Sequence, residues 1–119
     1  MPREYSRNQR LGSEVLRTLS ELLRFEVKDP RLATVSLTAV DLSRDLSVAR
    51  VYFSLLDPDA PVEPAQLGLE RAAGFLRGKL GRALKIRHVP ELRFAHDDSA
   101  EQGARISELI DGALGAGQD

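Results

Sequence analysis

The chain has 119 residues, of which 42% are hydrophobic and 29% charged, and its formal net charge is -1. This length suits one domain over residues 1–119, and the absence of cysteine excludes a disulfide framework, a thiolate metal site and a cysteine nucleophile. No apolar run approaches the roughly 20 residues that span a bilayer, and the first ten residues lack the apolar segment of a secretory signal, so we expect a cytoplasmic monomer without membrane contact.

A helix is predicted first. Its apolar face has the i, i+4, i+7 spacing of a helix and consists of Leu11, Val15, Leu19, Leu22, Leu23 and Val27. The helix should end near Lys28, because Pro30 disfavours helical backbone at the residue before it. Arg7 and Arg10, with Arg3, form a small basic cluster near its start. This cluster is either an ordinary solvated helix start or part of a binding surface.

Two strands follow, over residues 35–40 and 47–55. The first is rich in β-branched residues, and the second alternates in hydrophobicity, with Ala49, Val51, Phe53 and Leu55 on one face. Only a short polar connector separates the two strands, so they should pair as an antiparallel hairpin. The apolar face of the hairpin should pack against the first helix.

A loop rich in proline and acidic residues occupies positions 57–64, and a helical pattern resumes near Ala65. The apolar side of this second pattern consists of Leu69, Ala73, Leu76, Leu80, Ala83 and Leu84. A short third strand is predicted over residues 91–95. A last helix should include residues 106–114, and we expect the tail over residues 115–119 to be disordered.

Positive charge is concentrated between Glu70 and Arg93. Seven basic residues lie there, Arg71, Arg77, Lys79, Arg82, Lys85, Arg87 and Arg93, against only two acidic ones, Glu70 and Glu91. A concentrated basic stripe on a nearly neutral protein is typical of a site for a polyanion. Few aromatic residues accompany it, and we expect Phe75 to belong to the core rather than to a stacking platform.

The second helical pattern is interrupted at Ala72-Ala73-Gly74, which predicts two helices meeting there, with Gly74 allowing close approach of another backbone. The chain also contains a literal Gly-x-x-Gly at residues 78–81. A nucleic-acid-binding loop at this position would leave only about residues 82–87 for the next helix, which is too short to pack. We therefore interpret Gly78 and Gly81 as small residues on a packed helix.

Several stretches in this order resemble the ribosome-binding factor A family. They are Asp29-Pro30-Arg31-Leu32, Ala49-Arg50-Val51-Tyr52, Ala73-Gly74-Phe75-Leu76-Arg77, Val89-Pro90-Glu91-Leu92-Arg93-Phe94 and Gly103-Ala104-Arg105-Ile106. The resemblance implies an α+β, type II KH-like domain, with a three-stranded sheet and helices packed on one face. It also implies that a helix kink of Ala72, Ala73 and Gly74 replaces the usual Gly-x-x-Gly loop, which clamps the nucleic-acid backbone.

The resemblance further implies a non-catalytic assembly factor that binds the 30S ribosomal subunit and its 16S rRNA. It implies a role in late maturation, including processing of the 16S 5′ end, a link to growth in the cold, and release by a GTPase. Neither a cofactor nor a metal is expected. The RNA-binding candidates are Arg71, Arg77, Lys79, Arg82, Lys85 and Arg87, with Arg7 and Arg10 from the first helix.

Two other functions compete with RNA binding. An enzyme could use His96, Asp97, Asp98 and Ser99, although the aspartates and the serine are better explained as ending a strand and capping the last helix. A protein-interaction module could use the acidic loop 57–63 or the last helix, in which case the basic stripe is only a solvated face. Charge reversal within the stripe separates this second possibility from RNA binding.

Overall fold

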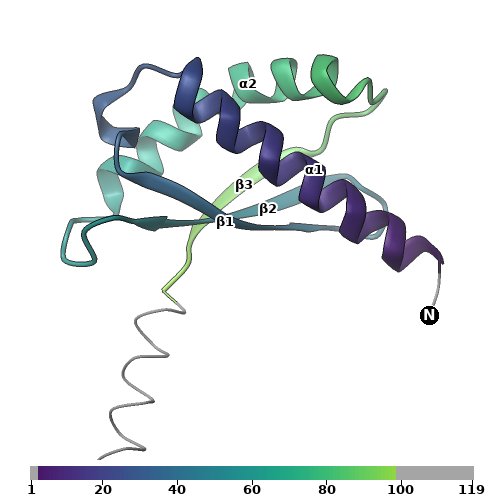
Figure 1. Cartoon of the computed structure of the whole chain (residues 1–119), viewed down its shortest axis with the longest axis horizontal. Helices are drawn as coiled ribbons and strands as arrows, with labels where there is room; N and C mark the ends of the chain where they lie inside the picture. The colour runs from purple at the N-terminus through teal and green to yellow at the C-terminus, as the bar shows by residue number, and fades with distance from the viewer. Residues whose placement is uncertain (1–2, 99–119) are drawn as a thin grey trace, which may run out of the picture.

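The computed structural model describes residues 3–98, and the side chains from Arg7 onward. The elements are α1 (Arg3–Phe25), a 3-10 turn (Pro30–Leu32), β1 (Val35–Leu42), β2 (Val48–Leu55), α2 (Glu63–Leu84) and β3 (Glu91–His96). Figure 1 shows both helices on the same face of one three-stranded sheet, which confirms the predicted α+β architecture. The predicted last helix and the tail over residues 115–119 lie outside the described residues.

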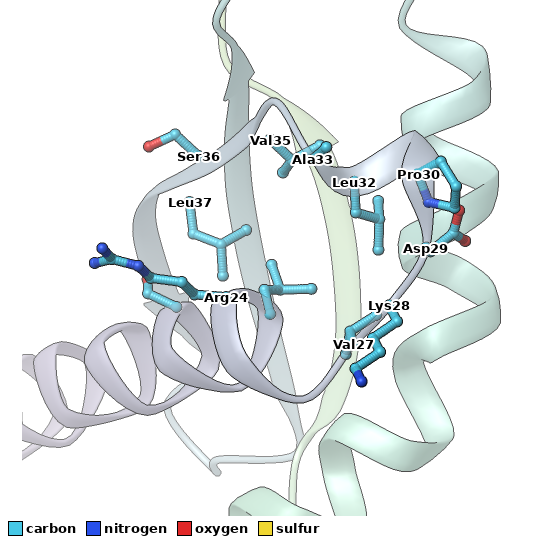
Figure 2. A pocket seen from close by; sticks show the side chains of 12 residues that line it. Arg24, Val27, Lys28, Asp29, Pro30, Leu32, Ala33, Val35, Ser36 and Leu37 are labelled. Carbon is cyan, nitrogen blue, oxygen red and sulfur yellow. The ribbon is translucent and has the colours of Figure 1, made fainter.

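The first helix ends earlier than its hydrophobic pattern suggests, at Phe25 instead of Lys28. The chain then turns through Asp29 and Pro30 into β1, and this turn borders an open hollow of about 700 Å³. Its polar side chains do not converge, because Arg24 lies on one side of the hollow and Asp29 on the other (Figure 2). The hollow therefore lacks the grouped polar atoms of a ligand site.

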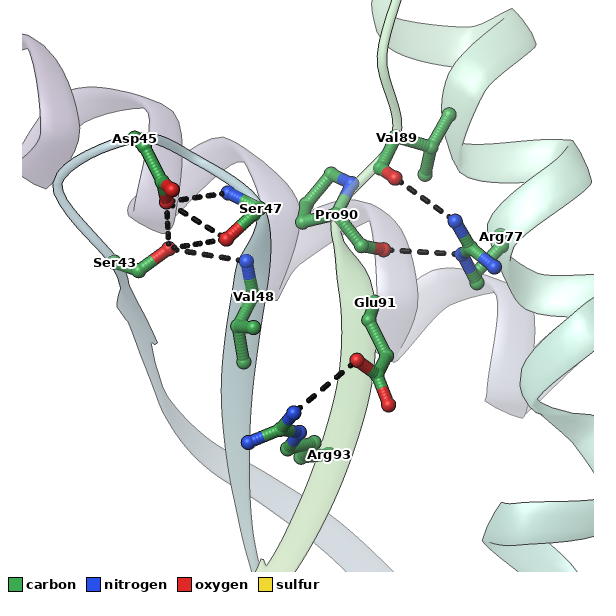
Figure 3. Close-up of polar contacts among 9 residues, drawn as sticks. All are labelled: Ser43, Asp45, Ser47, Val48, Arg77, Val89, Pro90, Glu91 and Arg93. Carbon is green, nitrogen blue, oxygen red and sulfur yellow. Dashed lines mark hydrogen bonds and ion pairs between the residues drawn. The ribbon is translucent and has the colours of Figure 1, made fainter.

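The sheet has the order β1-β2-β3, with β1 and β2 antiparallel, as predicted, and β2 and β3 parallel. A parallel pair needs a long crossover connection, and α2 supplies it. The turn between β1 and β2 is held by Asp45, whose Oδ1 accepts hydrogen bonds from the Ser47 hydroxyl at 2.7 Å, the Ser43 hydroxyl at 2.9 Å and the Ser47 N–H at 3.1 Å (Figure 3). These donors, led by the Ser47 hydroxyl, hold the pKa of Asp45 below its ordinary value.

The core lies between the helices and the sheet. Its fully buried side chains are Val15 and Leu19 from α1, Ala49, Val51 and Phe53 from β2, and Leu69, Leu76 and Leu80 from α2. These are positions that helical or strand periodicity assigned to the apolar faces, so that part of the prediction is confirmed. Leu55, also assigned to the inner face, is only partly buried.

The second helical pattern forms one continuous helix, α2, which corrects the prediction of two helices meeting at Ala72–Gly74. The helix nevertheless changes direction along its length (Figure 1). The reason predicted for Gly74 is also wrong, because a Cβ added there would meet nothing within 4 Å. Gly78 and Gly81 lie inside the same helix, which confirms that their Gly-x-x-Gly pattern is not a loop.

Candidate nucleic-acid interface

The solvent side of α2 carries four of the eight predicted RNA-binding residues. We define this outer face as Leu67, Arg71, Gly74, Phe75, Gly78, Lys79, Arg82 and Lys85. Arg71, Phe75, Gly78 and Arg82 follow one another at i, i+4, i+7 and i+11, so they form a single stripe along the helix. No acidic residue occurs in the sequence between Arg71 and Glu91. The outer face is therefore positive along the greater part of its length.

Arg71, Arg82, Lys85 and Arg87 are exposed. None of these four forms an ion pair with another of the residues that the structure describes. Lys85 also ends α2, because it adopts the left-handed conformation with a φ of 54° and its N–H donates to Gly81 O. These four cations are available to an external anion.

Arg77 has a different role from its neighbours. Its Nε donates to Pro90 O at 3.1 Å, and its second guanidinium nitrogen donates to Val89 O at 3.0 Å (Figure 3). The guanidinium thus fastens the segment before β3 to α2. Two of the five guanidinium N–H donors are used in this way, so Arg77 contributes to the stability of the fold, and its binding of RNA stays a prediction.

Lys79 is shared between two contacts. Its ammonium lies 3.5 Å from Oε1 of Glu26, the residue that follows α1, and 5.7 Å from the centre of the Phe75 ring. Arg93 is paired as well, with Glu91 at 3.3 Å. These partners offset part of the charge that the sequence places in the basic stripe.

The turn at Asp29 lies close to the outer face of α2. Its carboxylate caps the 3-10 turn by accepting from the Arg31 N–H at 3.0 Å, and it also pairs with the Arg31 guanidinium at 2.7 Å. The hydrogen bonds from Arg31, chiefly from its side chain, hold the pKa of Asp29 below its ordinary value, and the nearby charge of Arg71 contributes least to that shift.

Arg7 and Arg10 are exposed on the first turns of α1. Leu11 and Arg87 both line a groove of about 270 Å³ between α1 and the segment that follows α2. Arg7 lies one helical turn before Leu11 and therefore on the same face. The structure thus brings Arg7 towards the end of the basic stripe, whereas Arg10 is placed only as an exposed residue of α1.

Two of the residues that suggested an enzyme have structural contacts, and Ser99 lies outside the described residues. The His96 ring packs edge-to-face on Phe53 with centroids 5.6 Å apart, and Asp97 accepts from the Thr38 hydroxyl at 2.9 Å. Within residues 3–98, no three histidine or acidic side chains are grouped as metal ligands. Neither helix of that described part has the long apolar stretch needed to cross a lipid bilayer.

The expectation for Phe75 is wrong: 46% of its surface is exposed, and it lies on the outer face instead of in the core. The sequence does contain a signal for this placement. Phe75 follows Arg71 by four residues and precedes Arg82 by seven, so helical periodicity puts all three on one stripe. Hydrophobicity alone favours the core for this aromatic side chain, whereas its angular position favours the outer face.

Comparisons with known proteins agree on one family. A family model described as ribosome-binding factor A matches residues 7–110. Ribosome-binding factor A of Thioalkalivibrio sulfidiphilus is 49% identical, covering 96% of this chain and 88% of that protein, and the Azoarcus sp. protein of the same name is 47% identical, covering 96% and 90%.

The crystal structure of ribosome-binding factor A from Thermus thermophilus superposes with a TM-score of 0.68 at 32% identity, covering 75% of this chain and 93% of that one. A Thermus thermophilus model fitted into a cryo-EM map of a 30S-RbfA complex has a TM-score of 0.65 at 32% identity, covering 76% and 96%.

Proposed function

Because this chain belongs to the ribosome-binding factor A family, we propose that it binds the 30S ribosomal subunit by placing the outer face of α2 on 16S rRNA. The observation that carries this proposal is a set of cations, Arg71, Arg82 and Lys85, that form no ion pair among the described residues and lie on a stretch of helix without acidic residues. The fitted Thermus thermophilus relative supports the choice of the 30S subunit as the partner.

The spacing of the cations suits an extended phosphate backbone. Arg71 and Arg82 are eleven residues apart, which is about 16 Å along a helix at roughly 1.5 Å per residue. Several nucleotides of one strand can lie along this length. Each phosphate that a cation neutralises releases condensed counterions, so the affinity should fall steeply with salt, with a log–log slope of roughly -0.7 to -0.9 per phosphate.

We extend the proposal to the role implied by the family. The protein would assist late maturation of the 30S subunit, including processing of the 16S 5′ end, by binding rRNA and not by catalysing a reaction. Release would depend on a separate GTPase, and the site of action would be the cytoplasm. Support for this finer assignment comes from membership in the family.

Sedimentation of the protein with purified 30S subunits, 50S subunits and duplex RNA over a salt series tests the proposal. We expect preferential binding to 30S subunits, with a steep salt dependence. Arg71→Glu combined with Arg82→Glu should abolish that binding, because two phosphate contacts become repulsive. Arg77 is omitted from the variant since it holds Val89 and Pro90 in place.

The matched control reverses two exposed arginines outside α2, Arg17 in α1 and Arg44 in the turn between β1 and β2. It makes the same change in net charge and should bind 30S subunits as the wild type does. Equal binding of wild-type protein to 30S subunits, 50S subunits and duplex RNA would leave only a general RNA-binding domain. Unchanged 30S binding by the α2 variant would show that the outer face is merely solvated.

A further inference from the structure

An exposed aromatic ring lies in the middle of the positive outer face. Phe75 is 46% exposed, and Leu67, two turns earlier on the same side of α2, is 55% exposed. Single exposed apolar residues are common on protein surfaces and need no explanation. Here, however, the ring is placed between Arg71 and Arg82 on one helical stripe, so charge and aromatic surface occur together.

The core does not require Phe75. Its immediate neighbour Leu76 is fully buried, as are Leu69 and Leu80 on the same side of α2. Phe75 points away from this side by its position on the helix. The ring therefore leaves a large apolar surface in water that a polar side chain would not expose.

The surroundings of Phe75 keep the ring accessible. A Cβ added at Gly74 would meet nothing within 4 Å, and one added at Gly78 would meet only the Arg82 guanidinium, at 3.6 Å. The helix thus presents no side chain at two positions that neighbour the ring on the outer face. On the other side, the Lys79 ammonium lies 5.7 Å from the ring centre and is itself held by Glu26. A cation at this distance orients the ring and leaves its remaining surface open.

We propose that Phe75 stacks on an unpaired base of the bound RNA, while Arg71 and Arg82 contact phosphates on either side of it. This inference rests on the proposed function and names the RNA feature that the same surface recognises. Folded RNA displays unstacked bases in loops and bulges, and aromatic side chains bind such bases with little dependence on sequence. Positive charge on both sides of the ring favours a nucleotide over an apolar peptide, because only the nucleotide brings phosphates.

The experiment uses two RNA hairpins that differ by a single bulged nucleotide, a fluorescent purine analogue whose emission is quenched by stacking. We expect the wild-type protein to bind the bulged hairpin about tenfold more tightly than the continuous one and to quench its fluorescence. Phe75→Leu should lose both the preference and the quenching, and Phe75→Tyr should keep both. The salt slope of Phe75→Leu should equal that of the wild type, since no charge is removed.

The matched control is Phe25→Leu, which makes the same change at an exposed ring at the end of α1 that also has a cation over it, in this case Arg24. It should behave as the wild type does. The proposal is overturned if Phe75→Leu retains the preference and the quenching, or if Phe25→Leu loses them equally. In either case the proposed function is tested separately, by the salt slope and the 30S binding of the Arg71→Glu/Arg82→Glu variant.

Discussion

Two sets of residues on α2 use the same residue types for different purposes. In the inner set, whose members contact the rest of the fold, Leu76 fills the core, the exposed Arg77 fastens the segment before β3, and Gly81 lies against Val89. On the outer face, a bulky apolar residue, an arginine and a glycine recur as Phe75, Arg82 and Gly78, which make no such contacts within the described part of the chain. The inner set should therefore control stability, and the outer set should control binding.

The largest expected difference is in the free energy of unfolding, between variants of the two apolar residues Leu76 and Phe75. Leu76→Ala should lower the free energy of unfolding by about 2–5 kcal/mol, because it removes buried methyl groups and leaves a cavity. Phe75→Ala should lower it by less than about 1 kcal/mol, since the ring is half exposed and outside the core. Urea denaturation of both variants measures the contrast. Equal losses would mean that Phe75 supports the fold and would remove the basis for a role in binding.

The two glycines of the Gly-x-x-Gly pattern provide the second contrast. A Cβ at Gly81 would lie 2.6 Å from Val89 Cγ2, on a short and stiff side chain, so Gly81→Ala should destabilise the protein by about 1–3 kcal/mol. Gly78→Ala meets no such obstacle and should stabilise by about 0.5–1 kcal/mol, since alanine is the better helix former. Thermal melting compares the two. If Gly78→Ala were the more damaging change, the helical assignment of this pattern would be wrong.

Two exposed arginines of α2 that differ in their hydrogen bonds, Arg77 and Arg82, give the third contrast. Arg77→Gln should lower the free energy of unfolding by about 1–2 kcal/mol, because its hydrogen bonds to Val89 O and Pro90 O are lost or weakened. Arg82→Gln should leave the free energy of unfolding unchanged. It should reduce the log–log salt slope of RNA binding by about the contribution of one phosphate contact. Urea denaturation and a salt titration of RNA affinity separate these effects. A reduced salt slope for Arg77→Gln, without loss of stability, would return Arg77 to the binding surface.

Sequence periodicity predicted which residues face the core, because the angle around a helix and the alternation along a strand are local properties. It placed Leu69, Leu76 and Leu80 correctly for this reason. The roles of Arg77 and Gly81 depend on how the chain folds back over residues 85–90, and no periodicity within α2 contains that information. A count of basic residues therefore cannot distinguish Arg77 from the arginines of the same helix that form no such hydrogen bonds. The exposure of Phe75, in contrast, could have been predicted from its angle.

The smallest effect concerns the turn beside α2, where Arg31 and Arg71 both act on Asp29. The pKa of Asp29 is below its ordinary value in the folded protein, so near and below that value the unfolded chain binds more protons than the folded one. Asp29 therefore contributes stability that is fully present above about pH 4 and is lost as the pH falls through the folded pKa. Arg31→Gln should flatten this part of the pH profile of urea denaturation, because Arg31 donates the hydrogen bonds, whereas Arg71→Gln should change it little. If Arg71→Gln flattened the profile as much as Arg31→Gln, Arg71 would support the turn and would not be free to bind a phosphate.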